Sequence, residues 1–167
     1  MSVNKTLILN AKEVDQKIKR ISHQIIEEYH LEKKISIAGI SKNGFLLAKR
    51  IAVELESNSN INIDLTEINI NKNKPLAEQI NHEPNIHLKD QIVILMDDVL
   101  NSGKTLMHAA SHILNHNIKR MNTVVLVDRR HRKYPIKADW AGLTLSTTLQ
   151  EHISVEFLKN KIEVYLH

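Results

Sequence analysis

An apolar stretch that ends in two acidic residues constrains this chain more than any other feature of its sequence. Residues 91–96 have the pattern of a buried β-strand, and Asp97 and Asp98 follow it directly. A short loop then turns at Gly103 into an expected helix over residues 105–117. Ligands of open α/β sheets bind beyond the carboxyl ends of the strands, and the free N–H groups of a new helix attract anions. The stretch therefore predicts a phosphate site with acids beside it.

The loop residues suit a phosphorylated sugar. Ser102, Gly103 and Thr105 let the backbone approach a ligand closely and add hydroxyl donors. Asp97 and Asp98 would repel a phosphate, but they accept hydrogen bonds from sugar hydroxyls, and one of them can meet a metal ion. Acids followed by an anion-binding loop therefore predict a ribose-phosphate site.

Two other interpretations of the same stretch were weighed. Gly103-Lys104-Thr105 matches the end of an NTPase P-loop, but that motif needs a glycine where this chain has Asp98. The other alternative is a strand–turn–helix unit in which the acids only cap the helix. Acid pairs after a strand are common, so the acids alone fit this second interpretation equally well, whereas the full run of residues favours a ligand site.

Strand and helix patterns alternate along the chain, which predicts an α/β fold with a mainly parallel twisted sheet flanked by helices. Asn10 and Glu13 form an expected capping box for a helix that reaches His30. A second helix is expected over 45–56. The expected strands cover residues 35–40, 61–70, 123–127, 140–145 and 162–166. Residues 71–89 have little periodicity and predict a long mobile loop. No repeat or linker divides the sequence, so we expect a single domain over residues 1–167.

Composition narrows the class of protein. Hydrophobic residues make up 42% and charged residues 25% of the chain, which is ordinary for a globular domain. The chain contains no cysteine, so disulfides and thiolate catalysis are excluded. No signal peptide or membrane-spanning segment is visible, and we expect a cytoplasmic protein without membrane contact. The net charge of +4 is compatible with anionic partners, although composition alone favours a mildly basic, solvated surface.

The residues singled out above resemble a known family. The run from Asp97 to Thr105 closely resembles the PRPP-binding motif of type I phosphoribosyltransferases. Residues 39–50 resemble the pyrophosphate loop and following helix of the PyrR family, and residues 126–139 are similar to a segment distinctive of that family. The resemblance spans nearly the whole chain from about Leu9. It implies the type I phosphoribosyltransferase fold with a small hood, in a family that combines pyrimidine-operon RNA attenuation with uracil phosphoribosyltransferase activity.

The resemblance also implies roles for individual residues. Asp97 and Asp98 would be the catalytic residues that bind the ribose hydroxyls of PRPP, with Mg²⁺ near them that arrives with PRPP and is not held in a protein cage. The 5′-phosphate would be bound by Asn101, Ser102, Gly103, Lys104 and Thr105. Pyrophosphate would be bound by Ser41, Lys42, Asn43 and Gly44. The base would lie in the hood, against Asp128 and Arg129 together with residues 140–147.

One expected loop departs from the family. PyrR-type loops usually begin with a tyrosine–arginine pair that reaches the phosphates, whereas residues 69–74 of this chain read Asn-Ile-Asn-Lys-Asn-Lys. Lys72 and Lys74 are the expected replacements in a lid over residues 71–84, as point charges without the fork of an arginine. This departure keeps open a nucleotide-responsive RNA regulator with weak or absent catalysis.

The identity of the base depends on two further positions. Purine-salvage relatives usually carry an acid where this chain has Asn101, and an amide cannot accept the proton that the acid would take. Family members tend to have Gly-Lys-Asn where this chain has Gly142-Leu143-Thr144. We therefore expect transfer of phosphoribose from PRPP to uracil, giving UMP and pyrophosphate, and another nucleobase stays an alternative.

The remaining expectations concern partners. Lys19, Arg20 and His23 match positions on the family's RNA face, so a messenger RNA leader and UMP are expected partners, although basic helix residues are more often merely solvated. The family also implies a homo-oligomer, a dimer or larger. His108, His112 and His116 recur every four residues. A polar or interface stripe explains them better than a metal site does, because no acid and no metal motif accompanies them.

Overall fold

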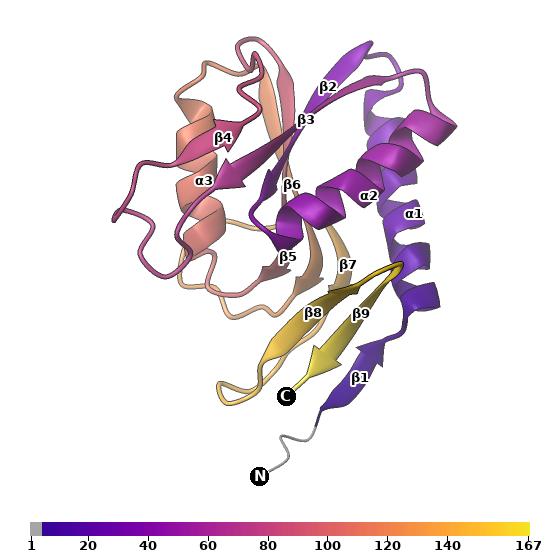
Figure 1. Cartoon of the computed structure of the whole chain (residues 1–167), viewed down its shortest axis with the longest axis vertical. Coiled ribbons are helices and arrows are strands. Elements are labelled where there is room, and N and C mark those ends of the chain that lie inside the picture. Colours follow the sequence, from indigo (N-terminus) through magenta and orange to yellow (C-terminus); the bar gives the residue numbers. More distant parts are fainter. Residues whose placement is uncertain (1–4) are drawn as a thin grey trace.

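A computed structural model describes residues 5–167 and contains a six-stranded sheet in the order β4-β3-β2-β5-β6-β7 (Figure 1). Every neighbouring pair is parallel except β3 and β4, which are antiparallel. The strands of this sheet are β2 (Lys34–Ile40), β3 (Asn62–Asn69), β4 (Asn81–Glu83), β5 (Ile92–Leu100), β6 (Arg120–Asp128) and β7 (Trp140–Thr144). The mainly parallel α/β architecture expected from the sequence is confirmed.

The helices cover both faces of this sheet (Figure 1). α1 (Ala11–Tyr29) and α2 (Asn43–Asn58) pack on one face, and α3 (Lys104–Leu114) packs on the other. Both hydrogen bonds of the expected capping box are present, because Asn10 and Glu13 each accept from the other's backbone N–H. The central strands are buried from both sides, so β2 and β5 are almost continuously apolar.

A second, antiparallel sheet has the order β1-β9-β8. It consists of β1 (Thr6–Leu9), β8 (Ile153–Leu158) and β9 (Lys161–Leu166) and lies below the central sheet in Figure 1. We call this sheet the hood. No helix within residues 5–167 is long and apolar enough to cross a membrane.

Several boundaries differ from those expected. β5 runs on through the acids to Leu100, because Val99 and Leu100 continue to pair with β6. The acids therefore lie inside the strand and do not follow its end. Residues 71–89 are not wholly irregular, since β4 pairs with β3 there. The segment 140–144 belongs to the central sheet and not to the hood, because β7 pairs with β6.

Candidate active site

The two acids of β5 are buried beneath a lysine. Asp97 is 4% and Asp98 8% exposed. The Nζ of Lys72 lies 3.0 Å from Oδ1 of Asp97 and 3.7 Å from Oδ1 of Asp98. The backbone N–H of Asp98 donates to the Asp97 carboxylate at 2.9 Å. A cationic side chain thus stands over the acid pair where a metal ion or sugar hydroxyls would bind.

Burial changes the acidity of this group of charges. Burial and the neighbouring Asp98 together raise the pKa of Asp97 to about 8, although Lys72 counteracts both. Burial lowers the pKa of Lys72, but the two carboxylates outweigh it, so the pKa of Lys72 lies above its ordinary value. Asp97 therefore changes charge near neutral pH, and an arriving cation would favour its deprotonated form.

The first residues of α2 contact the acid strand directly. Asn43 Nδ2 donates to Oδ2 of Asp98 at 2.9 Å and to the carbonyl of Val155 in the hood at 3.2 Å. A Cβ on Gly44 would lie 2.7 Å from the Met96 carbonyl oxygen, closer than real Cβ contacts allow. Glycine at position 44 thus allows the start of α2 to rest against β5. The structure brings this expected pyrophosphate loop and the acids together.

The expected phosphate loop turns through a left-handed residue. Gly103 has φ of +84°, a conformation that favours glycine, and α3 begins at the next residue. Gly103 has no side chain to cap α3, and Oγ of Ser102 accepts from the backbone N–H of Lys104 at 3.3 Å. The N-terminus of α3, which is the positive end of the helix, lines the cavity. The carbonyl of Ser102 accepts from the backbone N–H groups of Lys133 and Tyr134, which hold the loop from behind.

Arg129 joins this loop to the segment that leads into the hood. Its guanidinium donates to Oδ1 of Asn101 at 2.9 Å, to Oγ1 of Thr147 at 2.9 Å and to the carbonyl of Glu151 at 2.6 Å. Arg129 is only 7% exposed. Because its donors bond to protein acceptors, Arg129 orients the phosphate loop in this structure.

These elements surround a cavity of about 280 Å³. The acids, the whole phosphate loop, Asn43 and Lys72 line one side of it, and the hood supplies the opposite side through residues 152–155. Sequence reasoning assigned no role to this hood segment and treated His152 as ordinary. The alternation of Ile153, Ser154 and Val155 was the available sign of a strand with one face toward the core.

Other expected site residues lie outside this lining. Asp128 accepts from Arg132 Nη2 at 2.8 Å and from the backbone of Arg130, and it does not line the cavity. Lys74 does not line it either; its backbone N–H donates to Asn71. Ser41 lines a neighbouring cavity beside the loop after β3.

The expected RNA residues lie on α1. Lys19, Arg20 and His23 are all exposed. Arg20 is also engaged within the protein, because its Nη2 donates to the carbonyls of Ala141 and Gly142 at 2.9 and 2.8 Å. This arginine therefore helps to attach α1 to β7.

Comparison with known proteins places this arrangement in a family. Residues 5–158 match the model of the phosphoribosyl transferase domain. The Bifunctional protein PyrR of Clostridium kluyveri is 31% identical over 96% of this chain and 97% of its own length. The Bifunctional protein PyrR of Haemophilus ducreyi is 34% identical over 89% of this chain and 88% of its own length.

Solved structures agree on the fold. The hypoxanthine phosphoribosyltransferase of Trypanosoma cruzi superposes with a TM-score of 0.78 at 15% identity, covering 95% of both chains. A hypoxanthine-guanine phosphoribosyltransferase of Bacillus anthracis gives a TM-score of 0.70 at 20% identity, over 84% of this chain and 82% of its own. At these identities the likeness establishes the type I phosphoribosyltransferase fold and says nothing of the base. The family model and the full-length relatives together show that this chain belongs to the phosphoribosyltransferase family and, within it, to the PyrR proteins.

Proposed function

We propose that this chain transfers the phosphoribosyl group of PRPP to uracil and so forms UMP and pyrophosphate. The observation that carries the proposal is the shared cavity. In it a buried acid pair precedes the N-terminus of α3, and Asn43, at the start of α2, bonds to Asp98. Such a site suits a ligand that carries a phosphate, a pair of sugar hydroxyls and a second phosphate group.

Different residues bind different parts of PRPP. The N–H groups from Ser102 to Thr105 bind the 5′-phosphate, and Asp97 and Asp98 accept from the ribose hydroxyls. The turn at Ser41–Gly44 receives pyrophosphate. During transfer the bond from the anomeric carbon to a pyrophosphate oxygen breaks and a bond to uracil N1 forms, while the N1 proton passes to the departing pyrophosphate. Positioning and charge stabilisation supply most of the rate in a reaction of this kind.

Mg²⁺ fits the same site by its chemistry. Carboxylate oxygens and substrate phosphates are the ligands that Mg²⁺ prefers, and Asp97 and Asp98 provide the carboxylates. When bound with PRPP, the ion would neutralise charge on the departing pyrophosphate. In this structure the ammonium of Lys72 pairs with the acids. Binding of PRPP and Mg²⁺ would require the loop to move this ammonium toward the phosphates.

The enzymatic proposal is tested by supplying PRPP and Mg²⁺ with uracil, orotate, hypoxanthine, guanine or xanthine in turn. UMP and pyrophosphate formation from uracil is the expected result. Turnover on purines alone would redirect the proposal to another base, and failure with every base would refute it. Calorimetry of the Asp98→Asn variant with PRPP checks the site itself, since unchanged affinity would contradict the role of this acid.

We also propose that the chain binds the leader RNA of a pyrimidine operon through α1 when UMP occupies the cavity. Support comes from the exposed Lys19, Arg20 and His23 on one helix and from relatives named bifunctional. Titration of such an RNA with and without UMP is the test. Binding that is absent, or that UMP does not change, would refute this second function while leaving the first intact.

A further inference from the structure

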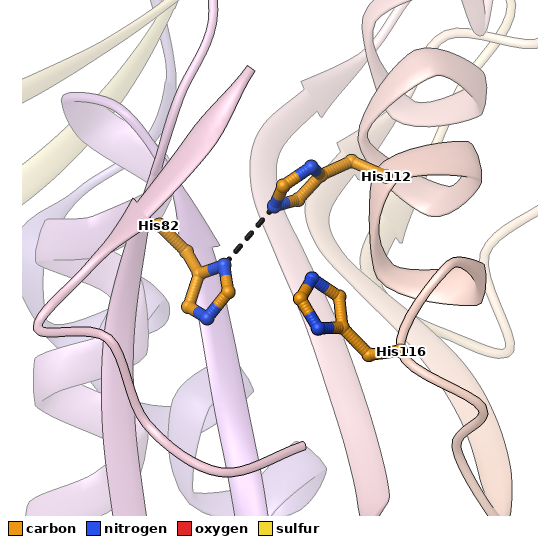
Figure 2. Close-up of side chains that lie close together, drawn as sticks. All are labelled: His82, His112 and His116. Carbon is orange, nitrogen blue, oxygen red and sulfur yellow. Dashed lines mark hydrogen bonds between the residues drawn. The ribbon is translucent and has the colours of Figure 1, made fainter. Parts of the chain in front are cut away.

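Three imidazoles converge at a place remote from the cavity of the acids. His82 projects from β4 toward His112, in the last turn of α3, and His116, just beyond that helix (Figure 2). The ring centroids lie 5.3 Å apart for His82 and His112, 4.9 Å for His82 and His116, and 5.3 Å for His112 and His116. We call these residues the histidine cluster. His108, which the sequence grouped with the latter two, does not belong to it.

The nitrogen atoms are spaced almost as a metal site requires. One ring nitrogen from each residue lies within 4.8 Å of the others, and His82 Nδ1 is 3.0 Å from His112 Nε2. Zn–N bonds of 2.0–2.1 Å in a tetrahedral site put ligand nitrogens roughly 3.3 Å apart. The observed spacings, from 3.0 Å to at most 4.8 Å, include that value.

His82 is the member whose surroundings call for a ligand. It is 7% exposed, and within residues 5–167 its Nε2 has no hydrogen-bond partner. A buried polar atom without a partner costs free energy, so such an atom in a native protein is a sign of an unrecorded water or ion. A metal ion bound at Nε2 itself would offset this cost.

The chemistry of the cluster also selects the class of ion. Burial, with His82 beside it, lowers the pKa of His112, and the same two causes lower the pKa of His116. Neutral imidazole is the form that binds metals. The cluster contains no carboxylate, so it offers little to Mg²⁺ or Ca²⁺, whereas nitrogen ligands suit Zn²⁺, Co²⁺ and Ni²⁺.

We propose that His82, His112 and His116 bind one divalent transition-metal ion of the zinc type, with water in the remaining position. The site is separate from the acids that would meet Mg²⁺ and shares no residue with their cavity. β4 follows the loop that carries Lys72, and α3 follows the phosphate loop. A metal ion would therefore fasten the far end of the Lys72 loop to the helix that begins at the phosphate loop.

The test is calorimetric titration of the whole chain, freed of metal by a chelator, with Zn²⁺. We expect one ion per chain and weakening by at least about tenfold in His112→Gln and in His116→Gln, since even partners behind the ligands are worth 10–100-fold. His108→Gln is the matched control, because it lies one turn earlier on α3 and should leave Zn²⁺ affinity unchanged. Mg²⁺ in place of Zn²⁺ should give no binding that these variants alter.

A spectrum of the unaltered chain with Co²⁺ supplies a readout that depends on no variant. Ligation by three nitrogens and a water should give intense visible bands of a four- or five-coordinate ion, and Zn²⁺ should abolish them. A pale octahedral spectrum would refute the proposal. So would Zn²⁺ binding that persists in the double variant His112→Gln/His116→Gln, or that falls equally in His108→Gln.

Discussion

The guanidinium of Arg129 donates to Oδ1 of Asn101 at 2.9 Å, so a side chain beyond β6 holds the first residue of the phosphate loop. The same guanidinium donates to Glu151 and Thr147 on the way to the hood. One buried guanidinium therefore holds both the phosphate loop and the segment that leads into the hood.

Arg129→Lys should loosen both segments, because an ammonium cannot reach several acceptors as a planar fork does. We expect the free energy of unfolding to fall by about 1–3 kcal/mol and the KM for PRPP to rise more than kcat falls. Denaturant unfolding and steady-state kinetics measure the two effects. Arg130→Lys, at the exposed neighbouring position, is the control, and an equal loss there would refute the special role of Arg129.

Asp97→Asn should change how stability depends on pH. An unfolded Asp97 releases its proton near pH 3.9, whereas its folded pKa is about 8. Between these values the folded state binds more protons, so this residue lowers the free energy of unfolding as pH rises from about 4 to about 8. Relative to the parent chain, the free energy of unfolding of the variant should therefore rise by a few kcal/mol as the pH increases across that range. A constant difference between the two unfolding curves at all pH values would contradict the burial of this acid.

Lys72→Gln should destabilise the chain most where Asp97 is charged. Its side chain is 39% exposed, so solvent screening limits the expected loss to about 1 kcal/mol at pH 8.5, with less at pH 5. Lys74→Gln removes an equal charge from the same loop and should cost less than about 0.5 kcal/mol at either pH. Thermal unfolding of both variants at the two pH values makes the comparison, and matching losses would show that Lys72 does not compensate the acids.

Gly44→Ala should separate the expected pyrophosphate loop from the acid strand. The added Cβ would meet backbone atoms of Met96 and Asp97 at 2.7 and 3.0 Å, and backbone cannot turn aside as a side chain can. We expect a loss of about 1–3 kcal/mol and weaker PRPP binding. Val53→Ala, at an exposed position of the same helix, should leave PRPP affinity as it was. Calorimetry with PRPP distinguishes the two.

Sequence patterns predicted those helices and strands whose residues follow a recognisable pattern over a short stretch of chain. The apolar stripe and capping box of α1 and the apolar run of β5 carry their information within a few neighbouring residues. In the hood only β9 was expected from the sequence, because β1 has four residues and depends on pairing with β9, and β8 is half exposed. The extension of β5 past Asp98 was likewise invisible, since acids are poor strand formers and only pairing with β6 keeps them there.

The same distinction applies to the site. The phosphate loop could be predicted because its residues are contiguous. The contact of Asn43 with Asp98, the approach of Lys72 and the pairing of His82 with His112 each join segments that are distant in sequence. Spacing along one helix suggested His108 as a companion of His112, yet the partner that the fold supplies comes from β4.

The pairing of β1 with β9 has a consequence for the order in which the protein is completed. Thr6 lies opposite Leu166, so the hood joins segments that leave the ribosome about 160 residues apart. The acids and the phosphate loop emerge well before Leu166 does. A nascent chain would therefore hold the acids and the phosphate loop before β9 arrives to join β1 to β8 and complete the hood.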